Sequence, residues 1–149
     1  MNEPRRTIPV PLPLAVWARD GLAAALAKAG LPNDDIHAAG PLFWRFERDD
    51  VPVGFGGLEI FEDQALLRSV VTLPPVRNRG IGTAIVASLE AEASIRGCRA
   101  IWLVTEKAAG FFVRLGYRAC ERSEAPTSVR EAVPFAHPAA AAAMMKPLA

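Results

Sequence analysis

The sequence contains few residues that form metal sites or disulfide frameworks. Its 149 residues include two cysteines, Cys98 and Cys120, and two histidines, His37 and His137. These four residues are far apart and match no CxxC or Cys/His ligand pattern, so we expect no zinc site. A disulfide between the cysteines stays open, but two free thiols in a reducing compartment fit the sequence better.

An excess of one charge and long apolar runs are also missing. The net charge of +1 argues against a nucleic-acid binder, although it leaves room for a small basic pocket for a phosphorylated ligand. No apolar run is long enough to span a membrane. The stretch from Ile8 to Val16 follows Arg5-Arg6 as the core of a signal peptide would, but three prolines interrupt it. We therefore expect a cytoplasmic protein.

The overall composition is typical of one globular domain. Hydrophobic residues make up 51% and charged residues 22% of the chain, as in folded rather than disordered proteins. A chain of this length buries roughly two-thirds of its unfolded surface without needing a disulfide or a metal. No internal repeat or linker divides the sequence, so we expect a single domain over residues 1–149.

Apolar periodicity and turn residues predict the order of helices and strands. The predicted helices are Leu14–Ala29, a short one capped by Asn33–Asp35 and ending near Gly40, Gly80–Arg96 and Ala108–Leu115. The predicted strands are Leu42–Arg48, Val51–Ile60, Ala65–Leu73, Ala100–Thr105, Tyr117–Arg122 and a final one around Met144-Met145. From Ala65 onward strands alternate with helices, which requires a crossover connection and a parallel pair of strands. The fold class is therefore α/β.

One segment, Val70–Thr83, has the features of an anion site. A buried strand leads into a loop with Arg77 and Arg79, and Gly80 and Gly82 then open a helix. The first N–H groups of a helix have no partner inside it, and glycine lets a pyrophosphate approach them closely. The loop is not a Walker motif, because no Gly-Lys-Ser/Thr follows, and it lacks the third glycine of a dinucleotide fingerprint.

Two segments in register resemble the GCN5-related N-acetyltransferase (GNAT) family. Arg77–Gly82 matches the family signature Arg/Gln-x-x-Gly-x-Gly/Ala, and Ala108–Tyr117 is similar to its Ala-x-x-x-Tyr-x-x-Leu-Gly-Phe segment. The resemblance is clear from Val51 to Arg122. It implies the GNAT acyl-CoA N-acyltransferase fold, a central mixed sheet flanked by helices, with acetyl-coenzyme A as co-substrate.

The resemblance also implies which residues hold the cofactor. In this family the strand before the signature supplies main-chain groups to the pantetheine arm, and the signature loop wraps the pyrophosphate. The implied cofactor contacts are Val71, Thr72, Arg77, Asn78, Arg79, Gly80, Ile81, Gly82, Thr83, Thr105 and Phe112. A main-chain N–H near Val71 would polarise the thioester carbonyl.

Two positions depart from the family pattern. The family often has asparagine where Thr105 stands, and tyrosine where Phe112 stands. That tyrosine usually protonates the leaving thiolate, which a phenylalanine cannot do. A thiol with a pKa of roughly 8.5 can leave without a dedicated acid. The single tyrosine, Tyr117, is interpreted as a core residue.

The acceptor side of the site is less defined. Glu59 is the candidate general base, where family members often place a carboxylate, although it could simply face solvent on an alternating strand. Arg68 and Ser69 interrupt a buried apolar strand. Arg68 either binds an acidic acceptor or pairs with Glu59 across the hairpin, because a bare buried charge is costly. The three tryptophans are interpreted as core or pocket wall: Trp17, Trp44 and Trp102.

A finer resemblance concerns a GNAT subgroup associated with arsenic-resistance operons. Ala65–Ser69, Leu103–Glu106 and Phe111–Tyr117 are similar to that group, although His137-Pro138 stands where the group typically has Cys-Pro. The implied function is acetyl transfer to the amine of a small molecule by direct attack. The alternatives are an acetyl-coenzyme A sensor that has lost catalysis, which Phe112 favours, and a protein-interaction domain. The apolar tail around Met144 could pair two subunits in a homodimer.

Overall fold

A computed structural model describes residues 8–33, 35–74, 80–136 and 142–148. The contacts within the chain define two compact units. The first unit comprises Met1–Leu58 and Ser69–Leu89, and the second comprises Glu59–Arg68 and Glu90–Ala149. Among the described residues, no helix combines the length and the apolar character that a bilayer crossing requires.

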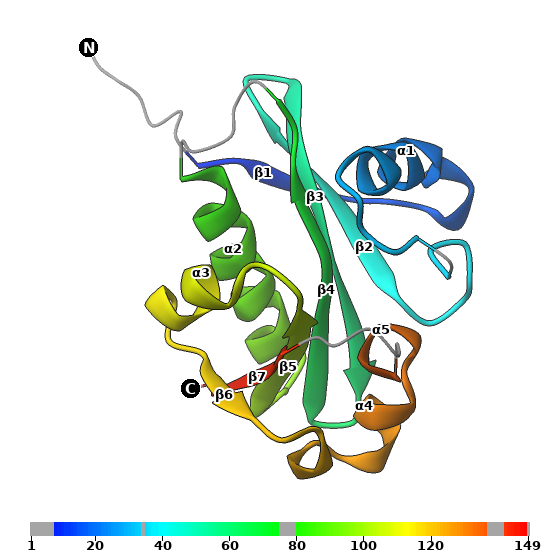
Figure 1. Cartoon of the computed structure of the whole chain (residues 1–149). Helices are drawn as coiled ribbons and strands as arrows, with labels where there is room; N and C mark the ends of the chain where they lie inside the picture. Colours follow the sequence, from blue (N-terminus) through cyan, green and yellow to red (C-terminus); the bar gives the residue numbers. More distant parts are fainter. Residues whose placement is uncertain (1–7, 34, 75–79, 137–141, 149) are drawn as a thin grey trace. The chain divides into compact units, whose positions relative to one another are not determined.

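The described strands form one mixed sheet in the order β1-β2-β3-β4-β5-β7-β6 (Figure 1). Its strands are β1 (Val10–Pro13), β2 (Leu42–Arg48), β3 (Val51–Phe61), β4 (Gln64–Thr72), β5 (Ala100–Thr105), β6 (Arg118–Cys120) and β7 (Ala142–Pro147). The α-helices are α1 (Asp20–Lys28), α2 (Ile81–Ile95), α3 (Ala109–Arg114), α4 (Thr127–Glu131) and α5 (Val133–Ala136). Two short 3-10 helices are η2 (Val16–Ala18) and η3 (Arg122–Glu124). The mixed sheet with helices confirms the predicted fold class.

Local sequence signals predicted most of the sheet correctly. The predicted bounds of β2 and β5 are the observed ones; those of β3 differ by one residue at its end, and those of β4 by one residue at each end. The β2–β3 turn is formed by Asp49 and Asp50, whose φ values of 55° and 64° are typical of a tight hairpin. The final strand is also confirmed, as β7 pairs antiparallel with β5 on one side and β6 on the other. Figure 1 shows β7 in red beside β5.

Met144 and Met145 lie inside this sheet rather than on a free tail. Met144 pairs with Leu103 and Ala119, and its exposed fraction is 1%. The exposed fraction of Met145 is 8%. The apolar residues that suggested pairing between subunits are therefore packed inside the second unit.

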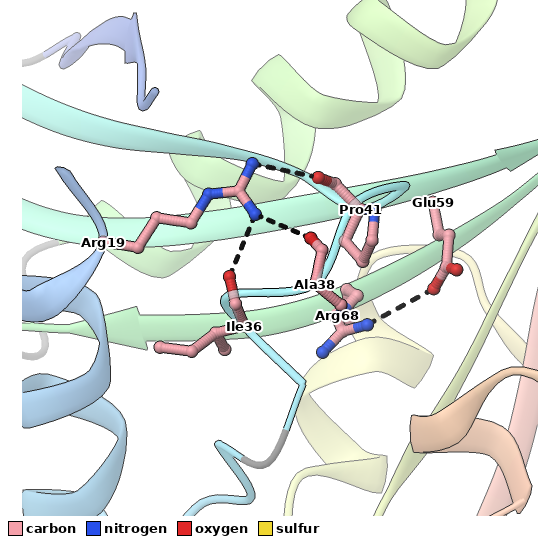
Figure 2. Close-up of polar contacts among 6 residues, drawn as sticks. All are labelled: Arg19, Ile36, Ala38, Pro41, Glu59 and Arg68. Carbon is pink, nitrogen blue, oxygen red and sulfur yellow. Dashed lines mark hydrogen bonds and ion pairs between the residues drawn. The ribbon is translucent and has the colours of Figure 1, made fainter. Parts of the chain in front are cut away.

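The N-terminal prediction is wrong in two respects. The expected helix from Leu14 begins only at Asp20, and Val10–Pro13 before it form β1. The second expected helix is absent from the described residues 31–33 and 35–41. Its carbonyl groups are used differently: the guanidinium of Arg19 donates hydrogen bonds to the carbonyl oxygens of Ile36 (2.9 Å), Ala38 (3.2 Å) and Pro41 (3.2 Å). Figure 2 shows these three carbonyls facing the Arg19 head group.

Prolines at alternate positions define the edge of the sheet at β1. The N–H of Leu14 donates to the carbonyl of Phe43 on β2 at 2.9 Å. Main-chain groups alternate sides along a strand, so the Val10 and Leu12 main chains also face β2 and those of Pro11 and Pro13 face outward. The outward side of β1 consequently lacks N–H donors at both prolines, and such edges resist pairing with another strand.

Glycines in β3 allow helix α2 to pack directly on the strand. A Cβ atom at Gly54 would lie 2.6 Å from Ile85 Cδ1, and one at Gly56 would lie 2.7 Å from Leu89 Cδ1. A Cβ at Gly57 would meet Phe43 Cδ1 at 2.5 Å. The glycines lower β-propensity, yet they fix the distance between strand and helix. Gly54 and Gly56 therefore leave room for Ile85 and Leu89 of α2 beside the main chain of β3.

Two of the three tryptophans are buried as predicted, and one is not. The exposed fractions of Trp44 and Trp102 are 7% and 5%. Trp17 on η2 is 87% exposed, so its assignment to the core or a pocket wall is wrong. The expected helix from Leu14 included Trp17, but the residue lies on η2, before α1 begins at Asp20. Helices α4 and α5 were missed because short segments carry little periodicity; their Val129 and Phe135 lie in the core of the second unit.

Candidate active site

The start of helix α2 has the backbone geometry of an anion site. Gly80 precedes the helix with a φ of 74°, a left-handed conformation that glycine adopts without strain. The N–H of Ala84 donates to the carbonyl of Gly80 at 3.0 Å, closing the first turn. The N–H groups of Ile81, Gly82 and Thr83 therefore belong to the first turn, where no helical acceptor exists.

The signature loop itself was predicted to supply positive charge. Arg77, Asn78 and Arg79 lie outside the described residues. Ile81 is buried and anchors the helix start in the first unit, whereas Thr83 is exposed. The described part of the segment thus shows a left-handed glycine and a helix N-terminus, the two features that a pyrophosphate needs from the main chain.

Some main-chain N–H and C=O groups of strand β4 point away from β3. The N–H of Leu73 donates to the carbonyl of Val53 at 2.9 Å. By alternation the main chain of Val71 also faces β3, and those of Val70 and Thr72 face away from it. Val71 itself is buried, with an exposed fraction of 7%. The N–H expected near Val71 is therefore offered by Val70, which the sequence did not single out because main-chain direction depends on the register of pairing.

Ser69 has a φ of 60° inside β4, whereas the other described non-glycine residues with positive φ lie in turns. Such a residue in a strand is typical of a β-bulge, which redirects the residues after it. The parallel pairing of β4 with β5 covers Gln64–Leu66 and Ala100–Trp102. Ser69 thus lies beyond the part of β4 that pairs with β5.

Glu59 and Arg68 form an ion pair within the second unit. Arg68 Nη1 lies 3.3 Å from Glu59 Oε1, and the exposed fractions of the two side chains are 4% and 19% (Figure 2). The sequence left open whether Arg68 pairs with Glu59 or binds an acceptor, and the pair is present. It places a carboxylate and a guanidinium together on the β3–β4 hairpin, with the carboxylate the more exposed of the two.

Thr105 and Phe112 take structural positions around helix α3. The hydroxyl of Thr105 accepts a hydrogen bond from the N–H of Ala108 at 3.0 Å, which supports the turn into the helix. Phe112 is buried and contacts Phe111 and Tyr117 edge-on, with ring centroids 5.0 and 5.4 Å apart.

Tyr117, the single tyrosine of the sequence, is a core residue as predicted. Its hydroxyl donates to Glu90 Oε2 at 2.8 Å. Burial and the neighbouring Glu90 carboxylate raise the pKa of Tyr117 well above its usual value. The Tyr117 hydroxyl therefore donates its proton to the hydrogen bond with Glu90. It does not substitute for the tyrosine hydroxyl that the family often has at position 112.

Comparison with known proteins gives the family. The model of the acetyltransferase (GNAT) family matches residues 12–117, more than half of the chain. The chain belongs to this family. An uncharacterised N-acetyltransferase of Chlorobaculum tepidum is 35% identical over 65 residues, which cover 44% of this chain and 41% of that protein. The match thus spans less than half of the relative's length.

Solved structures share the fold. N-acetylglutamate synthase of Neisseria gonorrhoeae, complexed with coenzyme A and N-acetyl-glutamate, has a TM-score of 0.72 at 17% identity, covering 87% of this chain and 32% of that one. A Mycobacterium tuberculosis protein in complex with coenzyme A has a TM-score of 0.71 at 20% identity, covering 95% and 100%. Both neighbours hold coenzyme A.

Proposed function

We propose that this protein transfers the acetyl group of acetyl-coenzyme A to the amine of a small molecule. The observation that carries the proposal is the left-handed Gly80 at the start of α2, directly after β4, in a chain of the acetyltransferase family. The main chain of Gly80–Thr83 binds the pyrophosphate, helped by Arg77, Asn78 and Arg79. Thr72 binds the pantetheine arm through its main chain, and Val71 holds that strand in the core.

The chemistry is a direct displacement at the thioester. The amine nitrogen forms a bond to the carbonyl carbon, and the carbon–sulfur bond breaks as the thiolate leaves. The N–H of Val70 polarises the carbonyl oxygen. Glu59 accepts the proton that the amine loses, directly or through a water molecule. The thiolate takes its proton from solvent, because Phe112 has no proton to give and the Tyr117 hydroxyl is bound to Glu90.

The acceptor we propose is amino-acid-like, with a carboxylate or a similar acidic group. Arg68 is buried in β4 beside Glu59, so a guanidinium lies next to the base. The acidic group would contact Arg68 near Ser69, where the strand departs from regular geometry. One structural neighbour is complexed with an N-acetylated amino acid. Membership of the arsenic-resistance-associated subgroup is also a proposal, as is a cytoplasmic location, which the two free cysteines support.

Absence of a tyrosine proton donor favours a second candidate function. A sensor that binds acetyl-coenzyme A without turning it over needs the pyrophosphate site but no acid. Phe112 and the committed hydroxyl of Tyr117 fit this alternative. Release of thiol from acetyl-coenzyme A across a panel of amines separates the two functions, because only the enzyme releases it above the rate without protein.

The test of the cofactor site is thermal denaturation with and without acetyl-coenzyme A. At about a hundred times its dissociation constant the ligand adds roughly 2.7 kcal/mol to the stability of the native state. We expect the melting temperature to rise for the wild type and not for Gly82→Trp, which fills the start of α2. Ser94→Trp, at an exposed position near the other end of the helix, is the matched control and keeps the rise. A wild type that shows no rise would contradict the proposed function.

A further inference from the structure

Glu90 is the centre of a polar cluster that the proposed chemistry does not use. Its Oε2 atom accepts from the Tyr117 hydroxyl at 2.8 Å. Lys146 Nζ lies 3.1 Å from Glu90 Oε1 and 3.2 Å from Oε2. Both side chains are partly buried, with exposed fractions of 18% for Glu90 and 27% for Lys146. The cluster lies within the second unit and joins α2, β7 and the residues after α3.

The same lysine holds the end of helix α3. Lys146 Nζ also donates to the carbonyl oxygen of Leu115 at 2.8 Å. Its ammonium group lies 5.5 Å from the centroid of the Tyr117 ring. A cation at this carbonyl satisfies a group that the helix leaves without a partner. Lys146 therefore fixes Leu115 and Tyr117 while it is itself fixed by Glu90.

The chain between these contacts has little freedom. Gly116 has a φ of 97°, and a Cβ atom there would lie 3.3 Å from Lys146 Cε. The N–H of Gly116 donates to the carbonyl of Val113, and that of Tyr117 to the carbonyl of Phe112, both at 3.0 Å. These two bonds form the Schellman motif that ends a helix with a left-handed glycine. Position 116 therefore needs glycine both for its conformation and for room beside Lys146.

The cluster reaches Phe112 through Tyr117. The two residues share the main-chain hydrogen bond described above, and their rings meet edge-on at an angle of 73°. Phe112 stands at the position that the proposed function assigns to the thiol end of the cofactor. Glu90 lies on the same helix, α2, that begins at the pyrophosphate end.

We propose that Glu90 is a positioning residue for the thioester end of the acetyl-coenzyme A site, acting on Phe112 through Tyr117 and Lys146. The inference rests on the proposed function, since it needs the thioester end of the cofactor to lie beside Phe112. Without the Glu90 carboxylate, Lys146 and the Tyr117 hydroxyl lose their shared partner, and α3 shifts relative to its β7 anchor. The pyrophosphate end of the site keeps its own contacts at the start of α2.

Calorimetric titration with two ligands separates positioning from simple stability. One ligand is acetyl-coenzyme A; the other is its phosphoadenosine diphosphate portion, which lacks the pantetheine arm and the thioester. For Glu90→Ala we expect the dissociation constant of acetyl-coenzyme A to rise about threefold or more, as expected when a coupled cluster is broken. The constant for the fragment stays within about twofold, because its contacts lie at the other end of the site.

Three further variants complete the test. Glu90→Gln keeps an acceptor for Tyr117 and should recover part of the lost affinity. Lys146→Met should cause a smaller loss of affinity in the Glu90→Ala background than in the wild type, because the contact between Glu90 and Lys146 is already gone there and only the contacts of Lys146 with Leu115 and Tyr117 remain to be lost. Glu92→Ala removes the exposed ion pair between Glu92 and Arg96 and should leave the dissociation constants of both ligands unchanged.

The outcomes separate the two proposals. The positioning role would be overturned if Glu90→Ala raised the dissociation constants of both ligands equally, or if it left the dissociation constant of acetyl-coenzyme A unchanged. A wild type that binds neither ligand would instead overturn the proposed function. If Glu90→Ala does not fold, Tyr117→Phe provides the same comparison, because it keeps the ring packing and removes only the hydroxyl bond to Glu90.

Discussion

Glu59 and Arg68, nine residues apart on the β3–β4 hairpin, form an ion pair with a nitrogen–oxygen distance of 3.3 Å. The guanidinium is buried, and burying a charge is tolerable only when it is paired and hydrogen-bonded. The pair keeps the Glu59 side chain in a fixed place, with an exposed fraction of 19%. A carboxylate held in this way can both neutralise Arg68 and accept a proton from an amine.

Glu59→Gln tests the base role. The amide keeps the size and one acceptor oxygen of the carboxylate but cannot take a proton. We expect the turnover number to fall about hundredfold or more, in line with the loss of a general base. The dissociation constant of acetyl-coenzyme A should not change, since Glu59 serves the acceptor. Steady-state rates and calorimetry measure the two quantities.

Glu62→Gln is the control, an exposed carboxylate on the same hairpin turn. If Glu59→Gln turns over as fast as Glu62→Gln, the pair with Arg68 is structural only.

Gly54→Ala and Gly110→Ala should change stability in opposite directions. A Cβ at Gly54 would lie 2.6 Å from both Ile85 Cδ1 and the main-chain oxygen of Val71, so strand or helix must move. We expect a loss of about 1–3 kcal/mol in the free energy of unfolding, as for other overpacked cores. Gly110 lies in α3 with its nearest neighbour atom, Arg114 Nη1, at 3.7 Å from such a Cβ. There alanine should add about 0.5–1 kcal/mol.

Urea denaturation measures both changes. A Gly54→Ala variant as stable as the wild type would contradict the close packing of α2 on β3. Loss of stability in Gly110→Ala would show that α3 needs more than helix propensity at that position.

The Tyr117 hydroxyl should stay protonated in the folded protein as the pH passes 10.0, the ordinary pKa of the group. Burial and the Glu90 carboxylate raise the pKa of Tyr117 in the native state only. The unfolded chain therefore releases this proton first, and the free energy of unfolding falls above that pH by up to about 1.4 kcal/mol per pH unit. Below the ordinary pKa the contribution is constant.

Ultraviolet absorbance checks this directly, because the chain has a single tyrosine. We expect tyrosinate to appear only as the protein unfolds. Tyr117→Phe removes this part of the pH dependence of the free energy of unfolding. The part due to the Cys98 and Cys120 thiols remains, because burial raises their pKa values as well. Tyrosinate in a protein that is still folded near the ordinary pKa would refute the prediction.

Replacing Pro11 and Pro13 by valine should make the chain associate. The substitution restores two outward N–H donors on β1, the first strand in the sheet order. Sedimentation velocity should then show species whose size grows with protein concentration. Leu12→Val is the control, because its main chain already faces Arg45 on β2. A double variant that sediments like this control would show that other features protect the edge.

Part of the candidate site could be predicted because its signals are local. Gly80 and Gly82 mark a backbone conformation and a helix start, and both are properties of neighbouring residues. The buried strand before them was evident from its apolar run. The role of Val70 could not be predicted, since the direction of its N–H depends on pairing between Leu73 and Val53, twenty residues earlier in the chain.

Local patterns predicted the hairpin turns at Asp49-Asp50 and Glu62-Asp63 and the start of α2, because turn residues and apolar periods occur along short stretches of chain. The order of the strands and helices then predicted the α/β class. Long-range packing instead shaped the N-terminal segment, where the Arg19 guanidinium binds the carbonyl oxygens of Ile36 and Ala38, in a stretch expected to be helical, and of Pro41. It also decided that Tyr117, Glu90 and Lys146 meet, although 27 and 56 residues separate Glu90 from its partners. Contacts at such distances along the chain arise from packing that no local pattern encodes.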